Sequence, residues 1–140
     1  MSSDFIFVYG TLKLGYWNNT LLEEATYVGE AQTWKSFMMA DGGFPVVYDR
    51  RDPRFEEQAN QYSGFIRGEV YEVSEEELER CDSLEGHPDW YCRERTLVFV
   101  DKGDDIVPLS PWIYIGTNVS RPVELLMTPT NGILEWKRST

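Results

Sequence analysis

The chain has 140 residues, of which 41% are hydrophobic and 14% aromatic, and its 13 basic and 24 acidic side chains give a formal net charge of -11. A chain of this size can bury one substantial core, so we expect a single domain over residues 1–140. The negative charge repels phosphate groups, which excludes general binding to nucleic acid or anionic membranes and favours small amines or cationic partners.

The sequence carries no sign of export or of a membrane anchor. It has two cysteines, Cys81 and Cys92, and its first residues, MSSDFIFVYG, contain neither a basic segment nor a long apolar one. Secreted disulfide domains usually have more cysteines, and a membrane span needs ~20 apolar residues. We therefore expect a soluble cytoplasmic protein with free thiols, whose oligomeric state the sequence does not define.

The first half of the chain is typical of strands separated by turns. FIFVY is a β-branched and aromatic run, as in a strand covered on both faces, and it ends at Gly10. NNTLLEEA predicts a short helix with Asn18 or Asn19 as its N-cap. Further strands are predicted over Thr26–Trp34, Ser36–Ala40 and the segment VVYDR.

The middle of the chain holds the clearest local signal. Residues 50–62 are charged and interrupted by a proline, which indicates a surface insertion, and the strand GFIRGEVYEV follows. Ser74 and Glu77 have the spacing of a capping box, so a helix should begin there, with Val73 packing on Leu78. Leu78, Cys81 and Leu84 recur at helical spacing and are expected to face the core.

The second half again favours strands, in YCRERTLVFVD and PWIYIG, joined through KGDD. The tail, residues 117–140, is of uncertain structure, because NGILEWKRST fits either a short docked helix or a frayed end. Strands outnumber helices and are joined mostly by short turns. The predicted fold class is therefore α+β, a small, mostly antiparallel β-barrel with a few flanking helices.

Glu85 is an unfavourable residue for its position at the C-terminal end of the predicted helix. Unpaired backbone carbonyls make that end electronegative, so Lys or Arg would be expected there. If its side chain points inward near Tyr91, desolvation raises the carboxyl pKa and suits the group to proton transfer. The alternative is an exposed glutamate in a helix that Gly86 and Pro88 simply end.

The segment VYGTLKLG offers a second candidate site. A strand that stops at Tyr9 presents successive backbone N–H groups in the loop, and Gly10 leaves room for a ligand such as an anion. The spacing matches neither a dinucleotide fingerprint nor a phosphate loop, so an ordinary turn is the alternative.

Cys81, His87 and Cys92 raise a third possibility, a zinc site that would need Asp82 or Asp89 as fourth ligand. The spacing lacks a Cys-x-x-Cys pair, and the first cysteine already fits the core stripe of its helix. We therefore expect no metal.

Three segments together, FVYGTLKLG, GEVYEV and CDSLEGHPDWYCR, resemble the γ-glutamylcyclotransferase-like (AIG2-like) family. The resemblance runs from about residue 5 to 116 and is greatest to the γ-glutamylamine cyclotransferases of that family. The residues that carry it are, in chain order, Tyr9, Gly10, Thr11, Leu12, Glu85, Tyr91 and Arg93.

The resemblance implies an enzyme without cofactors that binds a γ-glutamyl compound and releases 5-oxoproline. It assigns proton transfer to Glu85, substrate binding to Tyr9, Gly10, Thr11 and Leu12, a pocket wall or donor to Tyr91, and a structural ion pair to Arg93. The leaving group stays open, since a γ-glutamyl lysine, a polyamine conjugate, an antibiotic intermediate or a peptide presents the same reacting end. We expect that choice to lie in loops such as residues 50–62.

Two other functions remain open at this point. One is a non-catalytic protein of the same fold that binds a small ligand or a partner, and the other is a zinc-stabilised interaction module.

Overall fold

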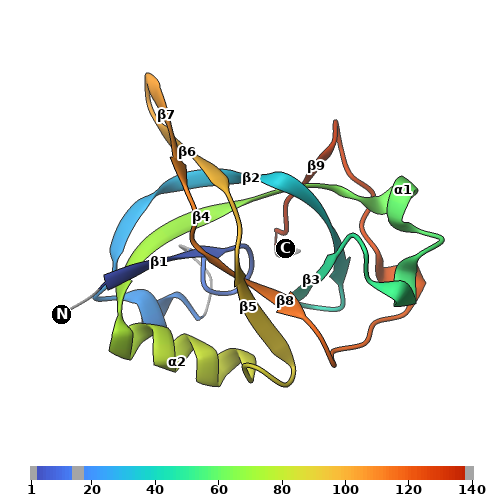
Figure 1. Cartoon of the computed structure of the whole chain (residues 1–140), viewed down its shortest axis with the longest axis horizontal. Helices are drawn as coiled ribbons and strands as arrows, with labels where there is room; N and C mark the ends of the chain where they lie inside the picture. Colours follow the sequence, from blue (N-terminus) through green and yellow to red (C-terminus); the bar gives the residue numbers. More distant parts are fainter. Residues whose placement is uncertain (1–2, 14–17, 138–140) are drawn as a thin grey trace.

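The computed structural model describes residues 3–13 and 18–137, and in this part of the chain the strands join into one nine-stranded sheet (Figure 1). The strands are β1 (Ser3–Val8), β2 (Thr26–Asp41), β3 (Pro45–Asp49), β4 (Gly64–Ser74), β5 (Tyr91–Arg95), β6 (Val98–Lys102), β7 (Asp105–Leu109), β8 (Trp112–Gly116) and β9 (Ile133–Leu134). The helices are α1 (Ala59–Tyr62), α2 (Glu75–Glu85) and the short 3-10 turns η1 (Asn19–Leu22), η2 (Pro53–Phe55) and η3 (Val123–Leu125).

The sheet follows the order β5-β8-β1-β4-β2-β6-β7, with β3 added to β2 and β9 added to β4. All pairs are antiparallel except β1 with β8 and β4 with β9. The α+β, mostly antiparallel prediction is thus confirmed. The sheet curls without closing into a barrel: β3 lies against β8, where a Cβ on Gly116 would lie 2.6 Å from Val46 Cγ1, but no ladder joins these strands in the described chain.

Strand β1 is covered on both faces, as its continuous apolar run predicted. Ile6 and Val8 belong to one buried cluster, whereas Phe7 and Tyr9 belong to another. Because side chains alternate along a strand, the two clusters lie on opposite faces of the sheet at this point. The loop after β1 therefore starts from a rigid base.

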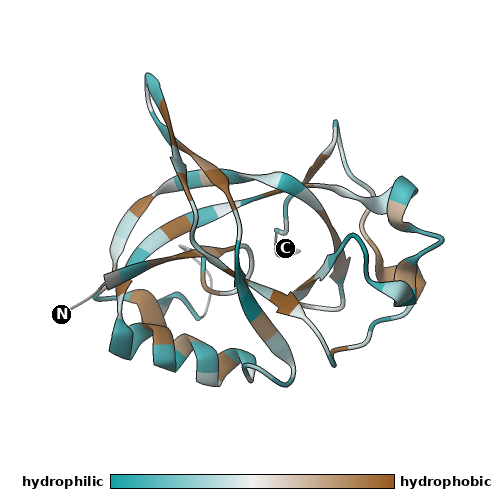
Figure 2. Cartoon of the chain, in the orientation of Figure 1, coloured by the Kyte–Doolittle hydropathy of each residue, from teal (hydrophilic) through white to brown (hydrophobic). Residues whose placement is uncertain are grey.

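Helix α2 covers the first of these clusters (Figure 1). Its predicted capping box is confirmed: Ser74 Oγ accepts from the Glu77 backbone N–H at 3.2 Å, and the Glu77 side chain accepts from the Ser74 N–H at 2.8 Å. Leu78 and Cys81 are buried as expected, and Figure 2 shows hydrophilic residues along the outer side of the helix. The prediction for Leu84 is wrong, because its side chain belongs to neither core cluster, lines an open pocket at the end of the helix and is 43% exposed.

Strand β2 is longer than predicted. The sequence suggested two strands around Lys35, but the chain continues through a register shift between Gln32 and Ser36. Thr33 makes this possible, since its hydroxyl group accepts from the Ile66 N–H at 2.9 Å and donates to the Lys35 carbonyl at 2.7 Å. A side chain thus replaces part of the ladder, which strand propensity does not reveal.

The segment YCRERTLVFVD forms two strands rather than one. The break falls at Thr96 and Leu97, where the partner strand changes. Strand β5 pairs with β8 before the break, and β6 pairs with β2 after it. Backbone bonds from the Thr96 N–H to Pro111 O and from the Trp34 N–H to Leu97 O hold the crossing. Beyond it, β6 and β7 project as a hairpin (Figure 1).

The insertion and the tail are both ordered where the structure describes them. In the insertion, Phe55 is 3% exposed and its ring lies 4.7 Å from that of Tyr48. In the tail, β9 pairs with β4 and Trp136 is buried, so the described part is neither the docked helix nor the frayed end considered above. Residues 138–140 lie outside the described chain.

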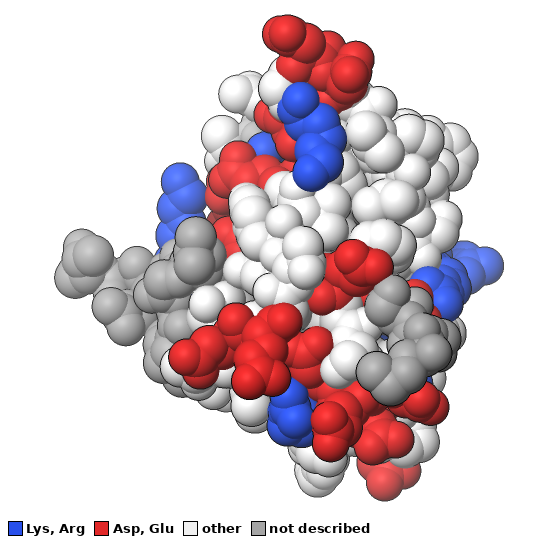
Figure 3. All heavy atoms as spheres, turned by 90° about the vertical axis from the view of Figure 1, so that its left-hand side faces the viewer, with Lys and Arg blue, Asp and Glu red and all other residues white. Residues whose placement is uncertain are grey.

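No helix in the described chain is both long and apolar enough to cross a membrane. Figure 3 shows Asp and Glu side chains gathered in the lower part of one face and again at its top. In the first turn of α2, Glu75 and Glu76 are exposed, whereas Glu77 is buried in the capping box. The negative charge is therefore partly concentrated at this surface rather than spread evenly over the molecule.

Candidate active site

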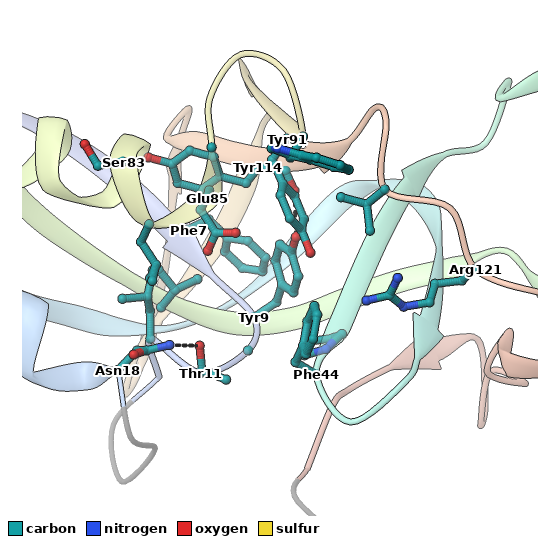
Figure 4. Close-up of a pocket in the computed structure, with 18 residues that line it drawn as sticks. Phe7, Tyr9, Thr11, Asn18, Phe44, Ser83, Glu85, Tyr91, Tyr114 and Arg121 are labelled. Carbon is teal, nitrogen blue, oxygen red and sulfur yellow. Dashed lines mark hydrogen bonds between the residues drawn. The ribbon is translucent and has the colours of Figure 1, made fainter.

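The loop after β1 and the end of α2 meet in a pocket of about 760 Å³ (Figure 4). All six residues named as candidates from the sequence line it: Tyr9, Gly10, Thr11, Leu12, Glu85 and Tyr91. The remaining lining residues are Phe7, Val8, Asn18, Phe44, Pro45, Ser83, Leu84, Gly86, Trp90, Tyr114, Val119 and Arg121. Segments far apart in the sequence thus build one cavity.

Glu85 faces this pocket because of how α2 ends. Gly86 takes the left-handed conformation, with φ 66°, and its N–H contacts the Asp82 and Ser83 carbonyls, while the His87 N–H donates to Asp82 O at 2.9 Å. This tight cap turns the chain away directly after Glu85. Burial raises the pKa of the Glu85 carboxyl to about 7, so the inward-facing alternative holds.

The end of α2 is tied to the sheet by a polar network around Asp82. Arg93 Nε donates to both oxygens of Asp82, at 2.9 and 3.2 Å, which confirms the ion pair expected for this arginine. Tyr114 Oη donates to Asp82 Oδ1 at 2.7 Å. These bonds fix the turn of helix that precedes Glu85.

Two tyrosines form the pocket wall beside Glu85. Tyr9 Oη donates to the Tyr114 carbonyl at 2.7 Å, which fixes its ring across the pocket. Burial raises the pKa of both Tyr9 and Tyr91, and the nearby Glu85 carboxylate raises each further. Both phenols are therefore protonated near neutral pH. Because the Tyr9 hydroxyl group already donates to Tyr114, Tyr91 is the one of the two whose hydroxyl group can donate to a ligand.

The loop is a tight turn in which the Lys13 N–H donates to the Gly10 carbonyl at 3.0 Å. A Cβ on Gly10 would lie 2.7 Å from Pro45 Cγ, so this glycine lets the loop pack on β3 rather than leaving space for a ligand, as the sequence suggested. Among the described residues, no acceptor meets the backbone N–H of Thr11 or Leu12. These two donors are available to a ligand.

Two asparagines hold this loop in place. Asn18 Nδ2 donates to Thr11 Oγ1 at 2.7 Å, the dashed line of Figure 4, and Asn19 Nδ2 donates to the Leu12 carbonyl at 2.8 Å. Neither caps a helix as predicted: the segment forms only the short 3-10 turn η1, and its N-cap side chain makes no capping bond. Leu14 and Gly15 of the motif lie outside the described chain.

The pocket also contains residues that sequence reasoning missed. Phe44, Trp90 and Arg121 also line it, and Arg121 comes from the tail. Trp90 lies against Gly86, beside Glu85, whereas Figure 4 shows Phe44 and Arg121 on the other side of Tyr9. No local pattern distinguishes these residues, because only the curled sheet brings them together. Residues 50–62, all described, contribute nothing to the pocket lining, which is evidence against their predicted role in choosing the leaving group.

The described residues contain no group of three His, Cys, Asp or Glu side chains placed to hold a metal ion. Cys81 is buried and Cys92 partly buried, and both are free thiols. His87 instead accepts a hydrogen bond at Nδ1 from the Arg93 backbone N–H, at 3.2 Å. The zinc hypothesis therefore gains no support from this geometry.

Comparison with known proteins identifies the family. The model of the family described as gamma-glutamyl cyclotransferase, AIG2-like, matches residues 6–132. This chain belongs to that family. A Methanocaldococcus jannaschii protein provisionally named gamma-glutamylcyclotransferase is 35% identical over 112 residues, covering 79% of this chain and 82% of that protein.

Two further proteins similar to this chain are informative. The gamma-glutamylaminecyclotransferase of Bos taurus is 31% identical over 131 residues, covering 89% of this chain and 71% of the bovine protein. The crystal structure of an AIG2-like protein from Mus musculus superposes with a TM-score of 0.72 at 23% identity and covers 100% of this chain and 99% of the mouse chain. That structure supports the fold.

Proposed function

We propose that this protein is a γ-glutamyl cyclotransferase that converts a γ-glutamyl amine, or a related γ-glutamyl compound, into 5-oxoproline and a free amine. The observation that carries the proposal is the position of Glu85, a carboxylate with a pKa of about 7 in the same pocket as the Tyr9–Leu12 loop. The name of the bovine relative favours an amine as the leaving group.

In the proposed reaction the substrate supplies its own nucleophile. The Glu85 carboxylate takes a proton from the α-ammonium group, and the freed amine attacks the γ-carbonyl carbon to close a five-membered ring. A pocket that holds the substrate folded supplies the proximity this step needs. A carboxylate with a pKa near 7 is suited to accept and return a proton at neutral pH.

Collapse of the intermediate completes the reaction. Negative charge on the former carbonyl oxygen is stabilised by the available N–H groups of the loop, those of Thr11 and Leu12. Protonated Glu85 then gives its proton to the departing nitrogen as the C–N bond breaks. The ring nitrogen still carries one proton more than the lactam product, and the Glu85 carboxylate passes that proton to the free amine or to water. The products are 5-oxoproline and the amine, and Glu85 returns to its carboxylate form.

The alternative is a non-catalytic protein that binds a γ-glutamyl ligand in the same pocket. Incubation with a panel of γ-glutamyl amides and peptides, followed by mass spectrometry for 5-oxoproline, separates the two. Glu85→Gln should reduce turnover by about 10²–10⁴-fold while ligand binding is retained, because the amide cannot exchange the proton.

A matched control is Glu79→Gln, which changes an exposed glutamate of the same helix. It should keep the activity of the wild type. Unchanged turnover in Glu85→Gln would remove the proposed mechanism, and no 5-oxoproline from any member of the panel would favour the binding protein.

A further inference from the structure

Among the described residues that line the pocket, Arg121 is the only cation and Glu85 the only carboxylate. Both charged residues belong to the lining, and Figure 4 shows Glu85 and Arg121 on opposite sides of Tyr9. The reacting end of a γ-glutamyl substrate occupies the Glu85 side under the proposed function. The Arg121 side is therefore where the departing portion of the substrate would lie.

The guanidinium group of Arg121 is positioned but not neutralised. It lies 4.9 Å above the ring of Phe44, and its Nη1 donates to the Ser120 carbonyl at 3.0 Å. Within the described chain, no carboxylate lies at ion-pair distance from it, in contrast to Arg93 and Arg54, which pair with Asp82 and Asp52. Several of its N–H donors can therefore bind a ligand.

The surroundings favour an elongated ligand that ends in an anion. Phe44, whose ring lies under the Arg121 guanidinium, is 44% exposed yet lines the pocket, so it can cover an aliphatic chain of a ligand. The volume of about 760 Å³ exceeds what a glutamyl group alone requires. A planar guanidinium at the end of an apolar passage suits a carboxylate, which it can bind through two parallel hydrogen bonds.

We propose that Arg121, with Phe44, forms a leaving-group subsite selective for amines that carry a carboxylate, as in a γ-glutamyl amide of an amino acid. The inference rests on the proposed function for the direction of the substrate. It differs from the expectation drawn from net charge, which favoured a cationic leaving group. Net charge describes the whole chain, whereas the charged side chain in this part of the pocket is the cation Arg121.

A set of substrates that differ only at the far end tests the subsite. The γ-glutamyl amides of δ-aminovalerate, butylamine and putrescine share one aliphatic chain and end in a carboxylate, a methyl group and an ammonium group. The wild type should show the highest kcat/KM for the carboxylate amide, about tenfold above the butyl amide, and the lowest for the putrescine amide.

Arg121→Gln should abolish the preference, bringing the ratio of the carboxylate to the butyl amide close to one, and Arg121→Lys should retain part of it. Arg51→Gln is the matched control, since this side chain is 84% exposed and outside the pocket, and it should keep the wild-type ratio. Equal turnover of all three amides by the wild type, or a preference for putrescine, would overturn the subsite.

If Arg121→Gln lowered kcat/KM by the same factor for all three amides, the subsite would also be overturned. Arg121 would then bind the glutamyl end of the substrate or stabilise the fold. Binding of the three amides to Glu85→Gln and to Glu85→Gln/Arg121→Gln, measured by calorimetry, separates this question from catalysis. Tighter binding of the carboxylate amide that depends on Arg121 supports the subsite even if no 5-oxoproline forms. Equal or absent binding contradicts it.

Discussion

Tyr114 Oη donates a hydrogen bond to Asp82 Oδ1 over 2.7 Å and so joins strand β8 to the helix that ends at Glu85. Arg93 binds the same carboxylate from β5, and its guanidinium also lies 4.4 Å from the ring of Trp112. Because Asp82 lies one turn before Glu85, its contacts set where the candidate catalytic group points.

Asp82→Asn should therefore destabilise the fold and impair the site together. The pair is largely buried, with side-chain exposures of 21% and 18%, so loss of the negative charge leaves Arg93 unpaired. We expect a loss of about 2 kcal/mol in unfolding free energy and a fall in the thermal midpoint of about 5–10 °C. Arg51→Gln, which breaks an exposed pair, should change it by less than about 1 kcal/mol. Equal effects would contradict this account.

Glu85 should make the protein less stable at higher pH. Its pKa is raised from 4.5 to about 7 in the folded state, so the folded protein holds the proton more tightly than the unfolded chain. The resulting stabilisation is complete below the unfolded pKa and is lost as pH rises through about 7.

Glu85→Gln, which stays neutral, should then exceed the wild type in stability at about pH 8 by up to about 3 kcal/mol. The difference should shrink towards about pH 5. Thermal midpoints of both proteins across this range measure it, with Glu79→Gln as the exposed control. A difference that does not vary with pH would show that Glu85 has an ordinary pKa.

The rate of 5-oxoproline formation should follow the same ionisation. Under the proposed mechanism the carboxylate form of Glu85 is the active one, so kcat/KM should rise about tenfold per pH unit below its pKa and level off above about 7. The profile is measured with a neutral γ-glutamyl butylamide. A rate that is flat between about pH 5 and 8 would argue against Glu85 as the base.

Gly86→Ala should disturb the turn that follows Glu85. The position has φ 66°, and an added Cβ would lie 2.7 Å from Trp90 Cδ1. We expect about 2–3 kcal/mol of lost stability and a lower kcat. Gly103→Ala is the control, since this glycine also has positive φ, 79°, but nothing lies within 4 Å of its Cβ position. If the two variants lose the same stability, contact with Trp90 has no role.

Asn18→Ala should act on the loop rather than on overall stability. It removes the bond to Thr11 Oγ1, which helps to orient the backbone donors of the loop. We expect kcat/KM to fall about tenfold and the thermal midpoint to change by only a few degrees. Thr11→Val removes the same bond from the other side, so the double variant should lose little more than either single one. Additive losses would exclude this role.

Local signals in the sequence predicted local structure well. The capping box of α2 depends on Ser74 and Glu77, which are neighbours on one helical turn, and β1 needs only its own apolar run. Errors arose where a distant partner decides the outcome. The bulge in β2 depends on Thr33 bonding to Ile66, and the break after β5 depends on a change of partner strand.

The same division holds for the site. Glu85 and the Tyr-Gly-Thr-Leu loop could be named from the sequence, because a carboxylate after a helix stripe and a glycine after a strand are local patterns matched by the family motif. Their meeting in one pocket, and the presence there of Asn18 and Arg121, was decided by the curled sheet. The sequence by itself determines which groups can ionise. Burial is a property of the folded chain, so only tertiary packing decided that the pKa of Glu85 lies near 7.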